Sequence, residues 1–266
     1  MTIFAVLSWS NFVGTDHELS LCDANIRRWL ARVIGPTWPV DEANLVVLAG
    51  PRFTADALLG QLEVFAKLAK KGDWITSIGA HHGTDEYPLY NESGVLVGRQ
   101  QAIVTDDFDF DKPGMVTAST IERAIAGCEA NVAMFLDCCT CGQFIRDTVD
   151  AGLRGMGWKQ EHPNRYLPNP AWAGKRAFRD LPVVTMCPAG ERIVVVTACA
   201  EGESAPDIDE GGFSDLATAF IQANPAIATG EIIADHVGHV LDPAIGNNPQ
   251  ASGPIADTPI CQEAKP

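Results

Sequence analysis

Apolar runs of strand length alternate along this chain with segments of helical periodicity. Strands are expected at Ile3–Trp9, Asn44–Leu48, Trp74–Gly79, Asn131–Leu136 and Arg192–Ala198. Apolar residues spaced three and four apart between them indicate helices that bury one face. This alternation predicts an α/β fold in which a mostly parallel central sheet is flanked by helices.

The predicted helices connect successive strands. The first carries Ile26, Trp29, Leu30, Val33 and Ile34 on one face. Thr54 is a favourable N-cap for the second, which carries an apolar stripe of Leu58, Leu62 and Phe65. Further helices are expected over residues 117–126, 212–222 and 231–241.

Two segments do not follow this pattern. Residues 84–113 contain QAIV between acidic and glycine-containing stretches and suggest a small hairpin, whereas residues 155–190 suggest a long irregular loop. Loops of that length in a compact domain are usually functional or mobile. The sequence shows no internal repeat and no clear linker, so we expect one domain over residues 1–266.

Composition excludes several classes of partner. The formal net charge of −15 argues against binding to nucleic acid or to an anionic membrane surface. No apolar run approaches the ~20 residues of a membrane span, and TIFAVLSW is expected to be a buried strand, not a signal peptide. The eight cysteines lack the dense spacing of a disulfide scaffold, which favours reduced thiols and a cytoplasmic location.

Three cysteines gather in MFLDCCTCGQF, at the end of one predicted strand. Cys138, Cys139 and Cys141 cannot all face one metal ion from an extended strand, and no second ligand pair of zinc spacing is present. Cys138 and Cys141 do form a CxxC pair, so thiol redox chemistry stays open. The third alternative is a nucleophile paired with a base from elsewhere in the chain.

A candidate base follows another predicted strand. WITSIGAHHGTDE ends in His81, His82 and Gly83. The carboxyl ends of parallel strands meet at one edge of a sheet, where α/β folds bind their ligands. His82 and Cys139 are therefore expected at the same edge, where a thiol and an imidazole can form a nucleophile and its base. Either residue alone is more often a packing or hydrogen-bonded bystander.

Both segments resemble motifs of the caspase-like cysteine peptidases. IGAHHGT is similar to the Ser-Gly-His-Gly-Thr turn of metacaspases and bacterial orthocaspases, and LDCCTCG to their Asp-Ser-Cys-His-Ser-Gly box. Weaker similarities fall in the family's order: HELSLCDAN, YNESGVLVGRQQAIVTDDFDF, VVVTACAEGESAPD with GGFSDLATAFI, and NNPQASG. The resemblance spans nearly the whole chain and implies a caspase-like (caspase-hemoglobinase) fold and cysteine endopeptidase activity.

The resemblance assigns roles to individual residues. The family's histidine directly precedes Gly-Thr, which selects His82 over His81, and its cysteine follows the aspartate of the box by two residues, which selects Cys139. Cys139 would then attack the peptide carbonyl, and His82 would protonate the leaving amine and later activate water. The backbone N–H groups of Gly83 and Cys139 would hold the oxyanion. No third catalytic side chain is evident.

The same resemblance suggests a substrate preference. Asp137 matches the acidic residue of the family's first specificity pocket, and Cys22 matches another pocket position. A carboxylate there favours Arg or Lys before the scissile bond (the P1 position). Two departures weaken this match: Asn25 stands where an acidic residue is expected, with Asp23 as a nearby substitute, and Ala80 replaces a serine. Asp137 could instead cap a following helix.

Metacaspases often carry a calcium switch, and the chain offers an acidic candidate for it. TDDFDFD contains Asp106 and Asp107, which match the family's paired aspartates, and oxygen ligands suit calcium. The sequence itself requires no cofactor, and an acidic loop in so acidic a chain is often merely solvated. Calcium is thus the single cofactor candidate.

The irregular loop of residues 155–190 is the expected place of self-cleavage if the chain cuts after basic residues. It carries Lys159, Arg165, Lys175, Arg176 and Arg179. The alternatives to a peptidase are a catalytically weak or inactive caspase-like interaction module and a redox protein that uses Cys138 and Cys141. The expected partners are peptides or proteins with a basic residue at the cleavage position, and the sequence does not set the oligomeric state.

Overall fold

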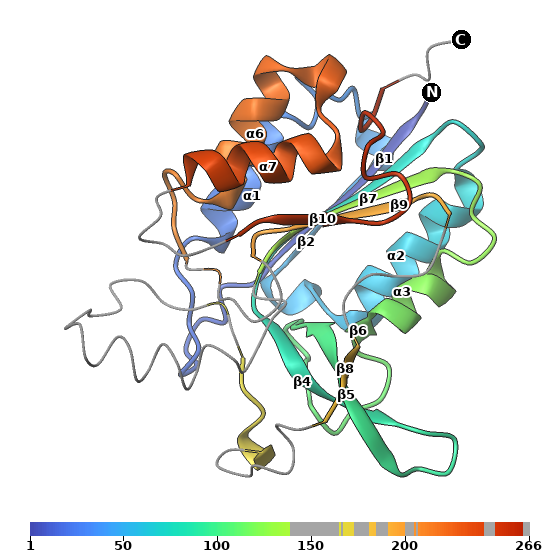
Figure 1. The fold of residues 1–266 in the computed structure, drawn as a ribbon, viewed down its shortest axis with the longest axis vertical. Helices are drawn as coiled ribbons and strands as arrows, with labels where there is room; N and C mark the ends of the chain where they lie inside the picture. The colour runs from blue at the N-terminus through green and yellow to red at the C-terminus, as the bar shows by residue number, and fades with distance from the viewer. Residues whose placement is uncertain are drawn as a thin grey trace.

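The computed structural model describes residues 1–138, 165, 167–172, 181–184, 191–199, 205, 207–241 and 248–262. A six-stranded sheet with the order β10-β9-β7-β3-β1-β2 lies at its centre (Figure 1). Its strands are β1 (Ile3–Trp9), β2 (Leu45–Ala49), β3 (Trp74–Ala80), β7 (Asn131–Asp137), β9 (Ile193–Thr197) and β10 (Gln250–Ser252). All are parallel except β10, which pairs antiparallel to β9.

Helices cover both faces of this sheet. They are α1 (Cys22–Arg32), α2 (Ala55–Leu68), α3 (Ala118–Ala124), α6 (Phe213–Ala223) and α7 (Gly230–Val240). Figure 1 shows α1, α6 and α7 on one face and α2 with α3 on the other. The prediction of a mostly parallel α/β sheet flanked by helices is confirmed.

The two faces of the sheet build two apolar layers because alternate side chains of a strand point in opposite directions. In β1, Ala5 and Leu7 pack with α1, α6 and α7, whereas Phe4 and Val6 pack with α2 and α3. The side chain of Thr54 accepts a hydrogen bond from the N–H of Ala57, as expected of the N-cap of α2. Burial on both faces makes the sheet a rigid support for the loops at its ends.

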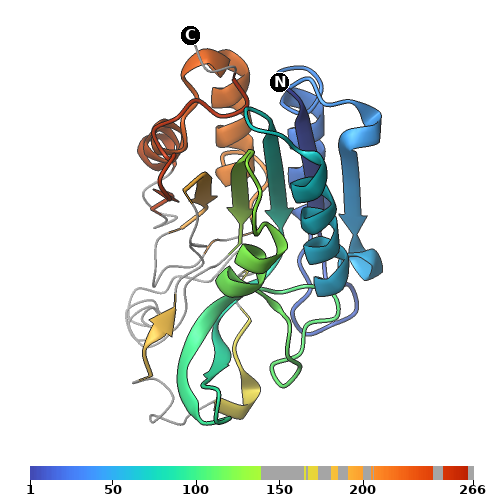
Figure 2. The ribbon, with the colours of Figure 1, turned by 90° about the vertical axis from the view of Figure 1, so that its right-hand side faces the viewer.

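A second, four-stranded sheet lies beyond the carboxyl ends of the central strands (Figure 2). It contains β4 (Gly83–Tyr90), β5 (Leu96–Ile103), β6 (Val116–Thr117) and β8 (Val183–Val184). The antiparallel pair of β4 and β5 is the hairpin expected within residues 84–113. The sequence did not predict β8, because its two residues lie inside the segment expected to be irregular.

Short 3₁₀ turns complete the described architecture: η1 (Glu42–Asn44), η2 (Gly50–Arg52), η3 (Pro170–Trp172) and η4 (Pro225–Ile227). Over the residues that the structure describes, no helix is long and apolar enough to span a bilayer.

Candidate active site

The carboxyl ends of β3 and β7 bring the predicted site segments together. The two strands are parallel neighbours, and Ala80 at the end of β3 is in register with Asp137 at the end of β7. His82 follows Ala80 by two residues, and Cys139 follows Asp137 by the same number. Cys139 and Cys141 lie outside the described residues. The structure therefore places His82 and Asp137 at one edge of the sheet.

The side chain of His82 is buried. Among the described residues, one of its ring nitrogens has a hydrogen-bond partner and the other has none. The side chain of Phe12 packs against its ring at 4.8 Å between centroids. Nε2 lies 2.5 Å from the carbonyl oxygen of His17, to which it donates, while Nδ1 has no partner in the described part of the chain. The His17 carbonyl thus orients the ring and fixes the proton on Nε2, which leaves Nδ1 as the nitrogen that can accept a proton.

Burial also sets the charge of His82. It lowers the pKa of the imidazole below its usual value, although the nearby main chain of His17 and Arg165 acts in the opposite direction. An unperturbed histidine has a pKa of about 6.5, so His82 is neutral at pH 7 and able to accept a proton.

His81 has a structural environment. Its side chain is fully buried, its Nδ1 lies 2.8 Å from the carbonyl oxygen of His82, and its ring packs on Phe53 at 5.2 Å. Burial lowers its pKa to about 3. A Cβ atom at Gly79 would come within 2.4 Å of the His81 Nε2, so only glycine leaves room for this ring. His82, not His81, faces the candidate site.

Beside His82, two carboxylates surround one buried guanidinium. Nη1 of Arg165 lies 2.5 Å from Oδ1 of Asp137, and Nη2 lies 2.8 Å from Oδ1 of Asp207. The side chains of Arg165 and Asp207 are 0% exposed. Charges buried this deeply must be paired, and here the two carboxylates line a buried pocket that the Arg165 guanidinium fills.

The other side chains around Asp137 hold its carboxylate in place. Ser214 Oγ donates to Asp137 Oδ2 at 2.6 Å, and Asn25 Nδ2 donates to the same oxygen at 3.3 Å. An acidic residue was expected at position 25. Asn25 instead donates a hydrogen bond that helps to hold the Asp137 carboxylate. Asp23 does not replace the expected acidic residue, because its carboxylate pairs with Arg27.

Cys22 and Ala80 also lie at this site. Cys22 is fully buried, and desolvation, partly offset by the charge of Arg165, raises the pKa of its thiol to about 12. It therefore stays neutral and adds no charge to the pocket. Ala80 is fully buried in the apolar layer of α1, α6 and α7.

The backbone of Arg165 is bound as closely as its side chain. The N–H of Gly83 donates to the Arg165 carbonyl at 2.8 Å, and the N–H of Arg165 donates to the Ala205 carbonyl at 3.2 Å. The N–H of Leu167 then donates to the Gly83 carbonyl at 3.0 Å. Gly83 was predicted to donate to a substrate oxyanion, and in this structure its N–H is directed at a carbonyl oxygen.

Sequence reasoning missed two parts of the site. Asp207 belongs to the segment VVVTACAEGESAPD, but nothing in its spacing indicates that it reaches Arg165. Its Oδ2 also accepts hydrogen bonds from the N–H groups of Ser20 and Leu21, at 2.7 and 3.1 Å. The other missed group is the His17 carbonyl, which no side-chain pattern can reveal.

The predicted calcium ligands have protein partners. Oδ1 of Asp107 accepts from the N–H of Ala55 at 2.9 Å and from Thr105 Oγ1, and its Oδ2 lies 2.7 Å from Nζ of Lys112. Oδ1 of Asp106 accepts from Ser10 Oγ at 2.7 Å. Within the described ranges no three His, Cys, Asp or Glu side chains gather around a point that could hold a metal. Because protein donors already engage their carboxylate oxygens, these residues do not fit calcium in this arrangement.

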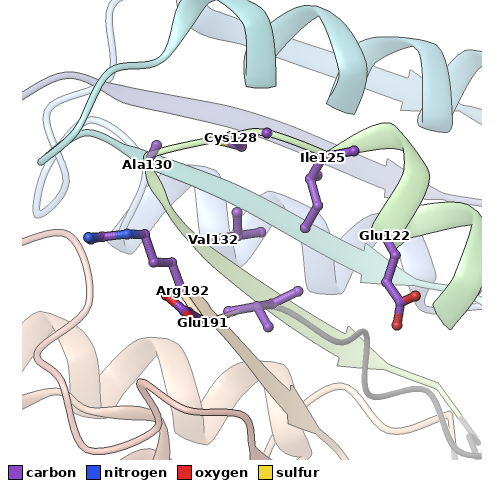
Figure 3. Close-up of a pocket in the computed structure, with 10 residues that line it drawn as sticks. Glu122, Ile125, Cys128, Ala130, Val132, Glu191 and Arg192 are labelled. Carbon is purple, nitrogen blue, oxygen red and sulfur yellow. The ribbon is translucent and has the colours of Figure 1, made fainter.

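A cavity of about 270 Å³ lies at the other end of the sheet. Its lining includes Ala130 and Val132 at the start of β7, and Ile193 at the start of β9. Figure 3 shows the side chains of Glu122 and Arg192 at its rim. Because these strands run away from the cavity toward His82, it is separate from the candidate active site.

Comparisons with known proteins bear on the fold. No family model matches the chain, and no curated protein matches it. Among solved structures, 49 chains match. One is protein GSU0716 from Geobacter sulfurreducens, with a TM-score of 0.67 and 14% identity over 95% of this chain and 94% of that chain. At this identity the likeness shows the fold alone: a mixed α/β architecture over nearly the whole of both chains.

Proposed function

We propose that this chain is a caspase-like cysteine endopeptidase, similar to metacaspases and orthocaspases, that cleaves after Arg or Lys. One observation carries the proposal: a buried guanidinium lies between Asp137 and Asp207 beside His82, and the carbonyl of the same arginine accepts a hydrogen bond from Gly83. A peptidase specific for a basic residue needs such a carboxylate pocket next to a carbonyl-binding amide and a base.

In this proposal Cys139 is the nucleophile. The register of β3 with β7 supports its pairing with His82, because each follows a registered residue by two positions. The Cys139 thiolate attacks the carbonyl carbon, and the oxyanion accepts from the Gly83 N–H. The C–N bond then breaks as His82 protonates the leaving amine. Water, deprotonated by His82, hydrolyses the thioester and restores the thiol.

The state of His82 supports both of its roles. A neutral imidazole can take the thiol proton and later return it to the amine, and the His17 carbonyl stabilises the imidazolium formed between these steps. The amide of Gly83 supports transition-state stabilisation, for which a single donor typically contributes about 2.7–4 kcal/mol.

The test is cleavage of fluorogenic peptides that differ only in having Arg, Lys or Asp before the scissile bond. We expect turnover of the Arg and Lys peptides and its loss in Cys139→Ala. Cys128→Ala is the matched control, because Cys128 lines the distant cavity and should keep full activity. Measuring each reaction with and without calcium tests the predicted switch.

Other outcomes would favour the other functions. Turnover that survives Cys139→Ala, or a preference for Asp, would reject the proposal. Absence of turnover with every peptide would favour the interaction module. A Cys138–Cys141 disulfide found by mass spectrometry after mild oxidation would favour the redox protein.

A further inference from the structure

We infer that Arg165 is the chain's own occupant of the substrate-arginine pocket, so that the described arrangement is an autoinhibited state. This inference rests on the proposed function, because it concerns the regulation of the same site. It concerns Arg165, one of the five basic residues of segment 155–190, which was named above as the expected place of self-cleavage.

The first support is complete occupancy of the pocket. The guanidinium of Arg165 contacts both carboxylates, and its Nη1 also donates to the backbone carbonyl of Asp137. The side chain is 0% exposed. A substrate arginine therefore cannot reach Asp137 or Asp207 until Arg165 has left.

The second support is the way in which the Arg165 backbone is bound. Its carbonyl accepts from Gly83 and its N–H donates to Ala205, so the residue is held on both sides by main-chain hydrogen bonds. The N–H of Leu167 continues this pairing on the Gly83 carbonyl. Extended peptides are recognised through main-chain bonds of this kind, with a pocket for the specificity side chain.

The third support is the place of Arg165 relative to the base. The Arg165 main chain approaches the His82 imidazole closely enough to raise its pKa, against the larger effect of burial. The Arg165 backbone thus lies close to both the Gly83 amide and the His82 imidazole, the two groups that the proposed reaction needs beside a substrate carbonyl.

Because Arg165 of the same chain fills the pocket, it should weaken the binding of added ligands there by a measurable amount. A ligand binds only the fraction of molecules whose pocket is vacant, so its apparent dissociation constant rises as that fraction falls. Weakening or removing the internal arginine should therefore strengthen the binding of a free guanidinium compound.

The experiment uses agmatine, which carries a guanidinium on a short alkyl chain, and N-carbamoylputrescine, in which a neutral ureido group replaces that guanidinium and the amine at the other end is kept. Both are titrated into the Cys139→Ala protein with Arg165, with Arg165→Ala and with Arg165→Lys, by calorimetry and by thermal unfolding. We expect agmatine to bind Arg165→Ala at least tenfold more tightly than the Arg165 protein and to raise its melting temperature. The ureido analogue should do neither.

Arg165→Lys keeps a positive charge in the pocket, so it provides a test even where the alanine variant does not fold. Lysine lacks the planar fork that pairs with two carboxylates, and agmatine should bind this variant several-fold more tightly than the Arg165 protein. Equal affinity for the Arg165 protein and its Arg165→Lys variant would overturn the inference.

Arg99→Ala is the matched control, because Arg99 pairs with buried Asp85 at 3.2 Å in the hairpin sheet. If Arg99→Ala raised the agmatine affinity as much as Arg165→Ala, the inference would be overturned, because any cavity left by an arginine would then bind agmatine. Because all of these proteins lack Cys139, the result does not depend on peptidase activity. If the protein cleaves peptides but substitutions of Arg165 leave the agmatine affinity unchanged, this inference alone is rejected. If those substitutions raise the agmatine affinity but the protein cleaves no peptide, the proposed function alone is rejected.

Discussion

At two places in this molecule, aspartate carboxylates bind a basic side chain of the same chain. Asp137 and Asp207 hold Arg165 in a fully buried pocket, whereas Asp107, next to Asp106, holds Lys112 on a loop where the lysine side chain is 45% exposed. The sequence motifs assigned a cation to both places: a substrate arginine to the first and calcium to the second.

The difference between the two places lies in desolvation. Around Arg165 the charges have lost their water, so each depends on its protein partner. Around Lys112 water competes with the ion pair, which is therefore weak. The two places thus carry similar charges but should contribute differently to stability.

Replacing Arg165 by methionine should have the largest effect on stability. It leaves Asp137 and Asp207 facing each other without a counter-charge, so the free energy of unfolding at pH 7 should fall by about 3–5 kcal/mol. Repulsion between the two carboxylates raises the pKa of one of them in the variant. That carboxyl takes up a proton as the pH falls, so the loss in free energy of unfolding should become smaller. Urea denaturation at pH 7 and pH 5 measures both effects, and a loss below about 1 kcal/mol would mean that burial does not distinguish the two pairs.

Acidification tests the surroundings of the buried pair. The folded-state pKa of His81 is about 3, below the unfolded value of 6.5, so between these values the unfolded chain binds the extra proton and stability falls with falling pH. From pH 6.5 to pH 5 His81 should account for a loss of about 2 kcal/mol. His81→Gln should show a flatter stability profile than the wild type.

Asp107→Asn should have a smaller effect. Burial raises the pKa of Asp107, but hydrogen bonds from Lys112, Ala55 and Thr105 outweigh it and hold the pKa below its usual value. The contribution of Asp107 to the free energy of unfolding is therefore complete above the pKa that this carboxyl has in the unfolded chain. It is lost as the pH falls through the lower pKa of the folded state. Because Asp107 accepts from the first N–H of α2, the variant should lose about 1 kcal/mol at pH 7 by urea denaturation. Asp109→Asn is the control on the same loop.

Lys112→Met should have the smallest effect, and it is the direct counterpart of Arg165→Met. The ammonium of Lys112 is solvated, so its loss should not change the urea midpoint measurably at moderate ionic strength. Any difference seen at low salt should disappear as salt is added. Two methionine variants of equal destabilisation would remove the distinction between the buried and the exposed pair.

Much of the architecture could be predicted from the sequence. The first strand was predicted with its observed bounds, and Thr54 was identified as the N-cap of α2. Both features depend on local residues: an apolar run that the sheet buries on both sides, and a side-chain oxygen that satisfies an open helix amide. Local signals of this kind do not require knowledge of distant partners.

The candidate site was predictable only in part. His82 and Asp137 follow strand ends, so the parallel register alone predicts that they share an edge. The contacts of Asp207 with Arg165 span 42 residues, and the His17 carbonyl reaches His82 over 65 residues. Neither follows from local periodicity, because loop closure, not strand register, brings these groups together.

The burial of His81 has a mechanical consequence for its neighbour. Its ring is confined by Phe53 and Gly79 and bound to the His82 carbonyl, so the peptide between the two histidines cannot swing independently of β3. In the proposed peptidase, adaptation to substrates of different shape would then fall to the segment on the other side of His82, which carries Phe12 and His17.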